Sequence, residues 1–134
     1  MNKMNLRSCV TFVVILCGLL AAGYAATSTL QIKPANISAF FGTWQGNWTY
    51  ENRSGGVTTE ISPSWDVDKA RVKVTVYGTF PTYDYSVTAR FSEGELLYNG
   101  KNLQMVFRLY GENTLLVPYS HNGSPGEYQL TRSR

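Results

Sequence analysis

From residue 40 onward, hydrophobic and polar residues alternate along the chain, and turn-forming residues interrupt the alternation about every twelve positions. At the start of this pattern, Trp44, Trp48 and Tyr50 share one parity and polar side chains occupy the other. A period of two residues is typical of a β-strand that buries one face. The pattern predicts eight strands, at residues 44–50, 57–61, 70–76, 83–91, 95–98, 103–109, 114–119 and 127–132.

The connections between these segments are short, and none has the length and pattern of a crossover helix. Short connections make neighbouring strands antiparallel. We therefore predict an all-β fold, an eight-stranded antiparallel up-and-down barrel, because closure removes the open edges of the sheet. A two-sheet sandwich is the alternative, and residues 62–69 could make its connection between sheets. Asn99-Gly100 is the strongest signal for a two-residue hairpin turn, since both positions tolerate positive φ.

The register of the strands assigns side chains to the interior or the exterior of the sheet. Shifting a strand by one residue would exchange its two faces, so burial tests the register. If the barrel closes, the first and last strands must pair, which brings Trp44 near Arg132. The expected buried set is Trp44, Val74, Val87 and Phe107, and the expected exposed set is Lys73, Thr88 and Gln104.

Residues 1–25 have the features of a secretory signal peptide. Basic residues precede an apolar run at 10–22, and Gly23-Tyr24-Ala25 supplies small residues at a cleavage site. An uncleaved anchor is less favoured, because the run is shorter than the roughly 20 residues that span a bilayer. Leu16 before Cys17 argues against a lipoprotein. We expect a signal peptide (1–25), an N-terminal arm (26–39) and a barrel domain (40–134), in a secreted or periplasmic protein.

Removal of the signal peptide changes the net charge and the cysteine content of the chain. The full chain carries a formal net charge of +3, but without residues 1–25 it keeps ten basic residues against nine acidic ones. Cys9 and Cys17 leave with the signal peptide, so no disulfide is available to the mature chain. A nearly neutral protein gives no reason to expect a nucleic-acid partner. We also expect no stable membrane insertion after cleavage.

The sequence offers little for catalysis. His121 is the one histidine, and it precedes Asn122-Gly123 in an expected turn, where a histidine is usually solvated. Asp66 and Asp68 lack the glycine and the later glutamate of a calcium-binding loop. We expect no enzymatic activity, no cofactor and no metal site. A hydrolase would have to depend on His121.

Binding is better supported, because the chain has 18 aromatic residues against 21 charged ones. An eight-stranded barrel is either filled by its side chains or just wide enough for one small ligand. We expect a small hydrophobic or aromatic ligand in the interior. The alternative is a filled barrel that binds a protein or a glycan through outward residues such as Trp65, Tyr77 and Tyr110, together with Gln45, Asn47 and Arg108. The candidate ligand-binding residues are Trp48, Tyr50, Tyr83, Tyr85, Phe107 and Tyr128.

The segment Phe41-Gly42-Thr43-Trp44, at the start of an eight-strand meander, resembles the Gly-x-Trp opening of the calycin barrels. These comprise the lipocalins, the fatty-acid-binding proteins and the avidins. The resemblance implies that an arginine near the end of the barrel packs across the first-strand tryptophan, and Arg132 over Trp44 would match it as a structural closure. A solvated terminal arginine is the alternative. The chain departs from the ten strands and helical lid of the fatty-acid-binding proteins and from the later tryptophans of the avidins, so the resemblance implies no particular ligand.

Overall fold

The computed structural model describes residues 30–78 and 82–133, and the chain from Gln31 onward forms one compact unit. The expected signal peptide, with both cysteines, lies outside the described residues. The described elements are β2 (Gln31–Ile32), η1 (Ile37–Phe40), β3 (Gly42–Tyr50), β4 (Arg53–Pro63), β5 (Lys69–Val76), β6 (Tyr83–Ser92), β7 (Glu95–Asn99), β8 (Leu103–Tyr110), β9 (Thr114–His121) and β10 (Ser124–Arg132).

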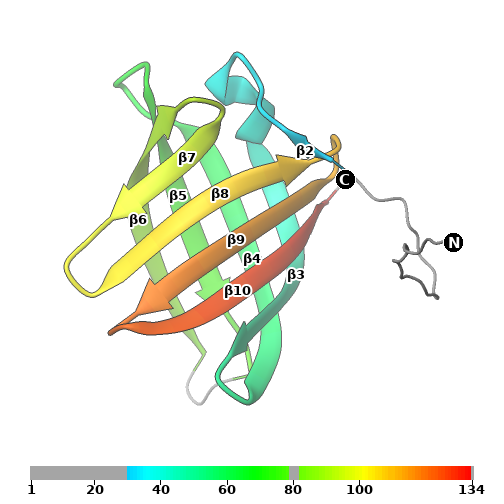
Figure 1. Cartoon of the computed structure of the whole chain (residues 1–134), viewed down its shortest axis with the longest axis vertical. Coiled ribbons are helices and arrows are strands. Elements are labelled where there is room, and N and C mark those ends of the chain that lie inside the picture. The colour runs from blue at the N-terminus through cyan, green and yellow to red at the C-terminus, as the bar shows by residue number, and fades with distance from the viewer. Residues whose placement is uncertain (1–29, 79–81, 134) are drawn as a thin grey trace, which may run out of the picture. The chain divides into compact units, whose positions relative to one another are not determined.

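Each strand from β3 to β10 pairs antiparallel with the next, and β10 pairs with β3 to close the sheet (Figure 1). The closing register matches Arg132 with Trp44 and Gly126 with Tyr50. The prediction of an all-β, eight-stranded up-and-down barrel is therefore confirmed. The segment 62–69 does not cross between two sheets, because β4 runs to Pro63 and β5 begins at Lys69 in the register that pairs the two strands.

The prediction of a two-residue turn at Asn99-Gly100 is wrong. Asn99 is the last residue of β7 and pairs with Gln104, so the loop between β7 and β8 spans residues 100–102. The Gln104 amide donates to the Gly100 carbonyl at 2.7 Å and the Gly100 N–H donates to the Leu103 carbonyl at 2.8 Å, which stabilises this longer loop. Two-residue turns with positive φ at both positions form instead at Glu93-Gly94 and Asn122-Gly123.

Five of the seven residues expected to be buried or exposed follow the prediction. Trp44, Val74 and Phe107 are fully buried, and Lys73 and Thr88 are exposed, as expected. Gln104 is half-buried, because its side chain bends back onto the loop carbonyl of Gly100. Val87 is also only half-buried, because it lies in a part of β6 that β7 does not cover.

One end of the barrel is closed by side chains around Trp44. The Arg132 guanidinium lies 4.2 Å from the centroid of the Trp44 ring. It also donates to the carbonyls of Phe41 (2.7 Å), Ala39 (3.0 Å) and Glu112 (3.1 and 3.2 Å). The Trp44 indole donates in turn to the Phe40 carbonyl at 3.0 Å. Arg132 therefore joins β10, the short helix η1 and the turn between β8 and β9.

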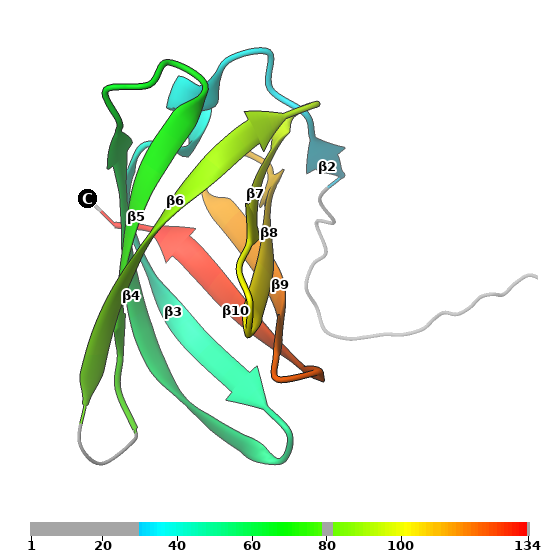
Figure 2. The same cartoon turned by 90° about the vertical axis from the view of Figure 1, so that its left-hand side faces the viewer.

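The barrel wall is uneven on the side of β7, which has five residues where β6 has ten. Residues 90–92 of β6 pair with residues 95–97 of β7, whereas β5 pairs with β6 along residues 83–90. Figure 2 shows β6 approaching β7 at one end and diverging from it toward the other. In the described residues, the pairing between β6 and β7 therefore covers less than half of β6.

We expect Arg132→Met to lower the free energy of unfolding by about 2–4 kcal/mol, because the change removes a cation–π contact and charged hydrogen bonds to three carbonyls. Arg132→Lys keeps the charge but not the planar fork, so its loss should be intermediate. Denaturant unfolding measures both. Arg90→Met, at an exposed position on β6, is the control and should change stability by less than about 0.5 kcal/mol. Equal losses in the Arg132 and Arg90 variants would contradict this role of Arg132.

Candidate functional site

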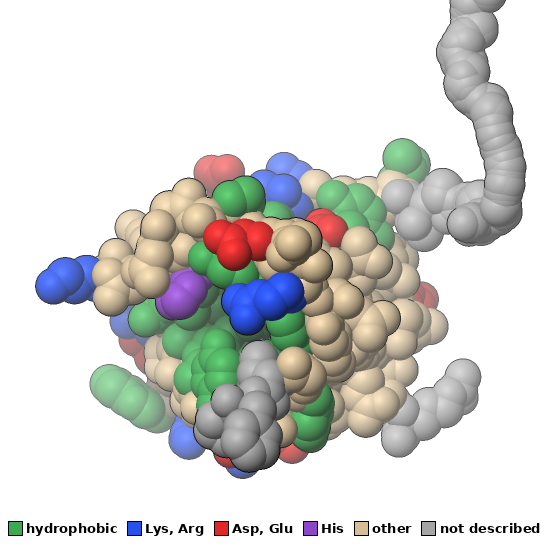
Figure 3. All heavy atoms as spheres, turned by 90° about the horizontal axis from the view of Figure 1, so that it is seen from below, with side chains coloured by type: hydrophobic (Ala, Val, Ile, Leu, Met, Phe, Trp, Pro, Cys, Tyr) green, Lys and Arg blue, Asp and Glu red, His purple; other side chains and the backbone are tan. Residues whose placement is uncertain are grey.

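The barrel contains a cavity of about 720 Å³ at the end opposite Arg132 and Trp44. Figure 3 looks onto this end, where hydrophobic side chains gather in the middle of the face and charged side chains and the histidine lie around them. The interior is thus filled at one end and hollow at the other. Tyrosines from five strands line the cavity: Tyr50, Tyr83, Tyr85, Tyr98, Tyr119 and Tyr128.

The strand ends explain why the tyrosines meet here. Tyr50, Tyr98 and Tyr119 lie in the last residues of β3, β7 and β9, which run toward this end of the barrel. Tyr83 is the first residue of β6 and Tyr128 is the middle residue of β10, and both strands start from this end. Consecutive inward residues of one strand are two positions apart, so each of these five strands adds one or two aromatic rings to the cavity lining. The cavity is therefore built from side chains far apart in the sequence.

The aromatic rings form a nearly continuous series of contacts. The ring centroids of Tyr119 and Tyr128 are 4.9 Å apart, and the rings of Tyr50 and Tyr119 are stacked at 6.1 Å with 8° between their planes. Tyr83 and Tyr85 are stacked at 6.2 Å. Such arrangements are favourable beyond the area that they bury. The wall thus presents both ring faces and phenol groups to the cavity.

The phenol groups of Tyr85 and Tyr128 form a hydrogen bond of 2.6 Å across the barrel, from β6 to β10. Burial, aided by the neighbouring Tyr85, raises the pKa of Tyr128 far above its usual value. Burial also raises the pKa of Tyr85, although the hydrogen bond with Tyr128 partly opposes this shift. Both groups are therefore neutral at physiological pH. The bond between them uses one of the two phenol protons, so the pair can donate one further hydrogen bond to a ligand and can accept others.

Hydrogen bonds to the main chain fix two tyrosines at the mouth of the cavity. The Tyr50 hydroxyl donates to the His121 carbonyl at 3.1 Å, and the Tyr119 hydroxyl donates to the Thr49 carbonyl at 3.3 Å. Gly126 makes room for this arrangement, because a Cβ there would lie 2.4 Å from the Tyr119 ring. Arg53 and Lys101 add two positive charges to the lining. The mouth is therefore polar and the interior aromatic.

Five of the six candidate residues line the cavity: Trp48, Tyr50, Tyr83, Tyr85 and Tyr128. Trp48 is fixed by a hydrogen bond of 2.6 Å from its indole to the Tyr77 carbonyl. Phe107 is not among the lining residues, because it is fully buried in the filled half of the barrel.

Sequence reasoning missed Tyr98 and Tyr119. Their parity could have found them, since Tyr98 is in phase with the buried Leu96, and Tyr119 is in phase with the buried Val117. Arg53 and Lys101 lie beside turns, where alternation gives no signal. Their place in the lining depends on how the strands are closed into a barrel.

The outward residues expected to form a partner surface lie on separate parts of the barrel. Gln45 and Asn47 are on β3, whereas Arg108 and Tyr110 are on β8, and β9 and β10 lie between those strands. Trp65 is 95% exposed in the loop between β4 and β5. These residues therefore do not form one continuous patch.

Among residues 30–78 and 82–133, no three His, Cys, Asp or Glu side chains are placed to share a metal ion. In the same residues, no helix has the length and hydrophobicity needed to cross a membrane.

Alkaline pH is expected to weaken the fold as the cavity tyrosines ionise. Unfolded tyrosines ionise near pH 10, whereas burial raises the pKa of Tyr119 to about 12 and also raises those of Tyr85 and Tyr128. The neutral phenols stabilise the fold fully below about pH 10, and this contribution is lost as pH rises through the folded-state pKa values. A titration followed by tyrosinate absorbance should show a late group of tyrosines. Ionisation of all the tyrosines in one step near pH 10 would contradict this assignment.

No protein-family model matches the chain, and the search of curated proteins found no similar sequence. The fold is a closed antiparallel barrel compatible with the calycin resemblance, and the resemblance itself rests on the Gly42-Thr43-Trp44 motif and the strand order.

Proposed function

We propose that the protein is a secreted or periplasmic, non-catalytic barrel that binds a small hydrophobic or aromatic molecule. The observation that carries this proposal is the tyrosine-lined cavity, whose lining includes the hydrogen-bonded pair Tyr85 and Tyr128. The location rests on the signal-peptide features of residues 1–25. The finer assignment to the calycin barrels is part of the same proposal and is supported by Arg132 over Trp44.

The size and lining of the cavity favour a small molecule with a ring. A volume of about 720 Å³ lies within the usual range of small-molecule sites, which combine apolar walls with a few fixed polar groups. The stacked rings of Tyr50 and Tyr119 offer a flat surface to an aromatic or alicyclic ring. The phenol pair can hydrogen-bond a hydroxyl or carbonyl group on that ring. Arg53 and Lys101 favour an acceptor or a negative charge at the outer end of the ligand.

The placement of His121 supports binding rather than hydrolysis. Its side chain is exposed at the mouth, and Tyr50 donates to its main-chain carbonyl. Its ring lies 6.0 Å from that of Tyr50 in an edge-to-face arrangement, a packing contact. A general base needs a partner whose proton it can take, whereas the hydroxyl of Tyr50 already donates to a carbonyl.

Screening small aromatic molecules by thermal shift and tryptophan fluorescence tests the proposal. A ligand should raise the melting temperature and alter emission from Trp48, which lines the cavity. Tyr85→Phe should weaken binding about tenfold, because it removes one buried hydrogen-bonding group. The matched control is Tyr110→Phe on β8, outside the cavity lining, which should bind as the unchanged protein does.

The proposal fails if no aromatic, lipid or sugar compound moves either signal. It also fails if Tyr85→Phe and Tyr110→Phe bind a ligand equally well, because the ligand would then lie elsewhere. A hydrolytic activity that is lost in His121→Ala would replace binding with catalysis.

A further inference from the structure

Part of β6 has an unpaired edge. β5 pairs with β6 along residues 83–90, but β7 pairs with it at residues 90–92 alone within the described chain. The Phe91 N–H donates to the Asp68 carbonyl at 2.8 Å, toward the β5 side. Main-chain groups of an antiparallel strand face its two neighbours alternately. The N–H and C=O groups of Ser86 and Thr88 therefore point away from β5, where β7 does not reach them.

This edge lies between the cavity inside the barrel and a hollow on its outer surface. The cavity and a second, outer hollow of about 520 Å³ are both lined by Ser86, Val87 and Tyr98. Val87 is half-buried, whereas Ala89, next to the residues that pair with β7, is fully buried. The wall is thus sealed near Ala89 and open along residues 84–88, in the region where β6 and β7 diverge in Figure 2.

The chain fills the corresponding edge of β8 with an added strand. β7 pairs with residues 104–107 of β8, and beyond them β2 pairs with Leu109 and Tyr110. β9 pairs with the same two residues, so β2 must occupy the β7 side of β8.

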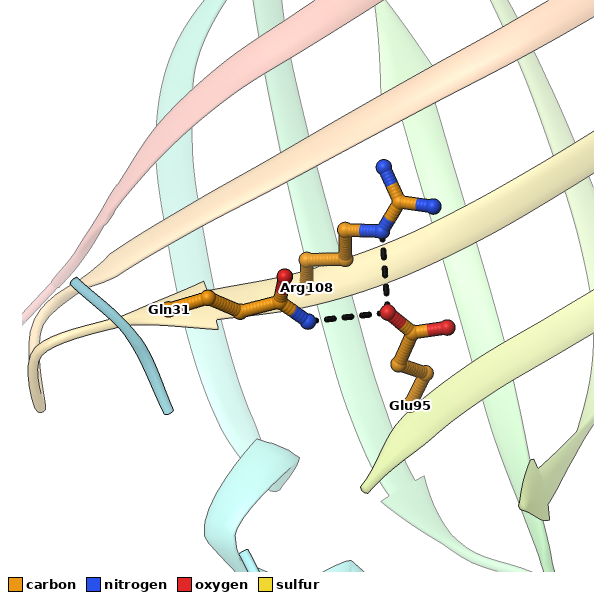
Figure 4. A network of polar contacts seen from close by, with 3 residues as sticks. All are labelled: Gln31, Glu95 and Arg108. Atoms are coloured by element: carbon orange, nitrogen blue, oxygen red, sulfur yellow. Dashed lines mark hydrogen bonds and ion pairs between the residues drawn. The ribbon is translucent and has the colours of Figure 1, made fainter. Parts of the chain in front are cut away.

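Side chains also attach β2 to the wall (Figure 4). The Glu95 carboxylate accepts from the Gln31 amide at 2.8 Å and from the Arg108 guanidinium at 2.9 Å. Partial burial would raise the pKa of Glu95, but these hydrogen bonds outweigh it and hold that pKa below its usual value. A short extended segment with two paired residues is therefore stably placed on one edge that β7 leaves open.

We propose that the open edge of β6 binds an extended peptide, which adds to Ser86 and Thr88 as a β-strand. Unpaired main-chain groups on a strand edge are complementary to another strand, and such addition is a common mode of peptide recognition. Side chains of an added strand alternate between the two faces of the wall. Those facing inward meet Tyr85 and Tyr98, and those facing outward meet the hollow lined by Arg71 and Lys73, with Glu60. The fitting peptide therefore alternates aromatic and acidic residues.

This inference uses the cavity wall but does not depend on a small-molecule ligand. Strand addition depends on main-chain groups of β6, whereas the proposed small-molecule site depends on the phenol groups of Tyr85 and Tyr128. Removal of the Ser86 N–H, which leaves these phenol groups in place, therefore separates the two functions.

The probe is a synthetic peptide of alternating glutamate and tyrosine, blocked at both ends and titrated into the purified protein. Amide hydrogen exchange followed by NMR should show new protection at Ser86 and Thr88, and calorimetry should measure binding. The same peptide methylated at its backbone nitrogens keeps its side chains but loses its donors. It should bind at least about tenfold more weakly.

The matched protein variants are Ser86→Pro and Ser86→Ala. Proline removes the N–H that faces the open edge and leaves the pairing with β5 intact, because that N–H does not point toward β5. Ser86→Pro should weaken peptide binding about tenfold, whereas Ser86→Ala, which keeps the N–H but loses a side chain that lines both hollows, should weaken it less. If Ser86→Pro does not fold, the methylated peptide still decides the question.

Three results would overturn the proposal. The first is no protection of Ser86 and Thr88 at saturating peptide. The second is equal binding of the methylated and unmethylated peptides, which would mean that a tyrosine side chain simply enters the cavity. The third is protection that rises with protein concentration without peptide, which would assign the edge to a second copy of this chain.

Discussion

The guanidinium of Arg132 over the indole of Trp44 is the contact on which the rest of the barrel depends. Arg132 lies where the last strand meets the first, and its hydrogen bonds reach Ala39 in η1 and Glu112 in the turn after β8, so one side chain fixes three separate segments at the same end. A chain with no cysteine after residue 25 cannot use a disulfide for this purpose. Because this end is fixed by packing and charged hydrogen bonds, the opposite end can remain hollow without loss of closure.

The hollow end follows from which residues the strands carry there. Near Trp44 the interior receives aliphatic side chains such as Val74 and Leu115, which fill space completely. Toward the other end it receives tyrosines, and a buried phenol must hydrogen-bond. Tyr85 and Tyr128 hydrogen-bond to each other, whereas Tyr50 and Tyr119 donate hydrogen bonds to main-chain carbonyls. Tyr50 and Tyr119 are held at the mouth in this way, and the Tyr85–Tyr128 pair crosses the interior, so a cavity lined by these rings remains.

The sequence predicted the fold better than the site. Alternation alone located all eight strands and placed Trp44, Val74 and Phe107 in the core, because a two-residue period reports directly on which face is buried. Alternation does not report depth along the barrel axis, so it cannot distinguish Phe107, which is buried in the filled half, from the residues that line the cavity. Turn positions were also less predictable. Asn99-Gly100 has the residues of a tight turn, but the hydrogen bond from Gln104 to the Gly100 carbonyl favours a longer loop.

Val87 shows that inward parity on a strand does not by itself lead to full burial. Its predicted parity is inward, and β6 pairs with β5 so that Val87 lies opposite the buried Val72. Burial nevertheless requires neighbours on both sides, and β7 stops short of this part of β6. The length of β7 is set by Glu93-Gly94 at one end and by the loop at residues 100–102 at the other. A short fifth barrel strand therefore has two consequences: β2 covers the exposed edge of β8, and the edge of β6 stays open beside the tyrosine cavity.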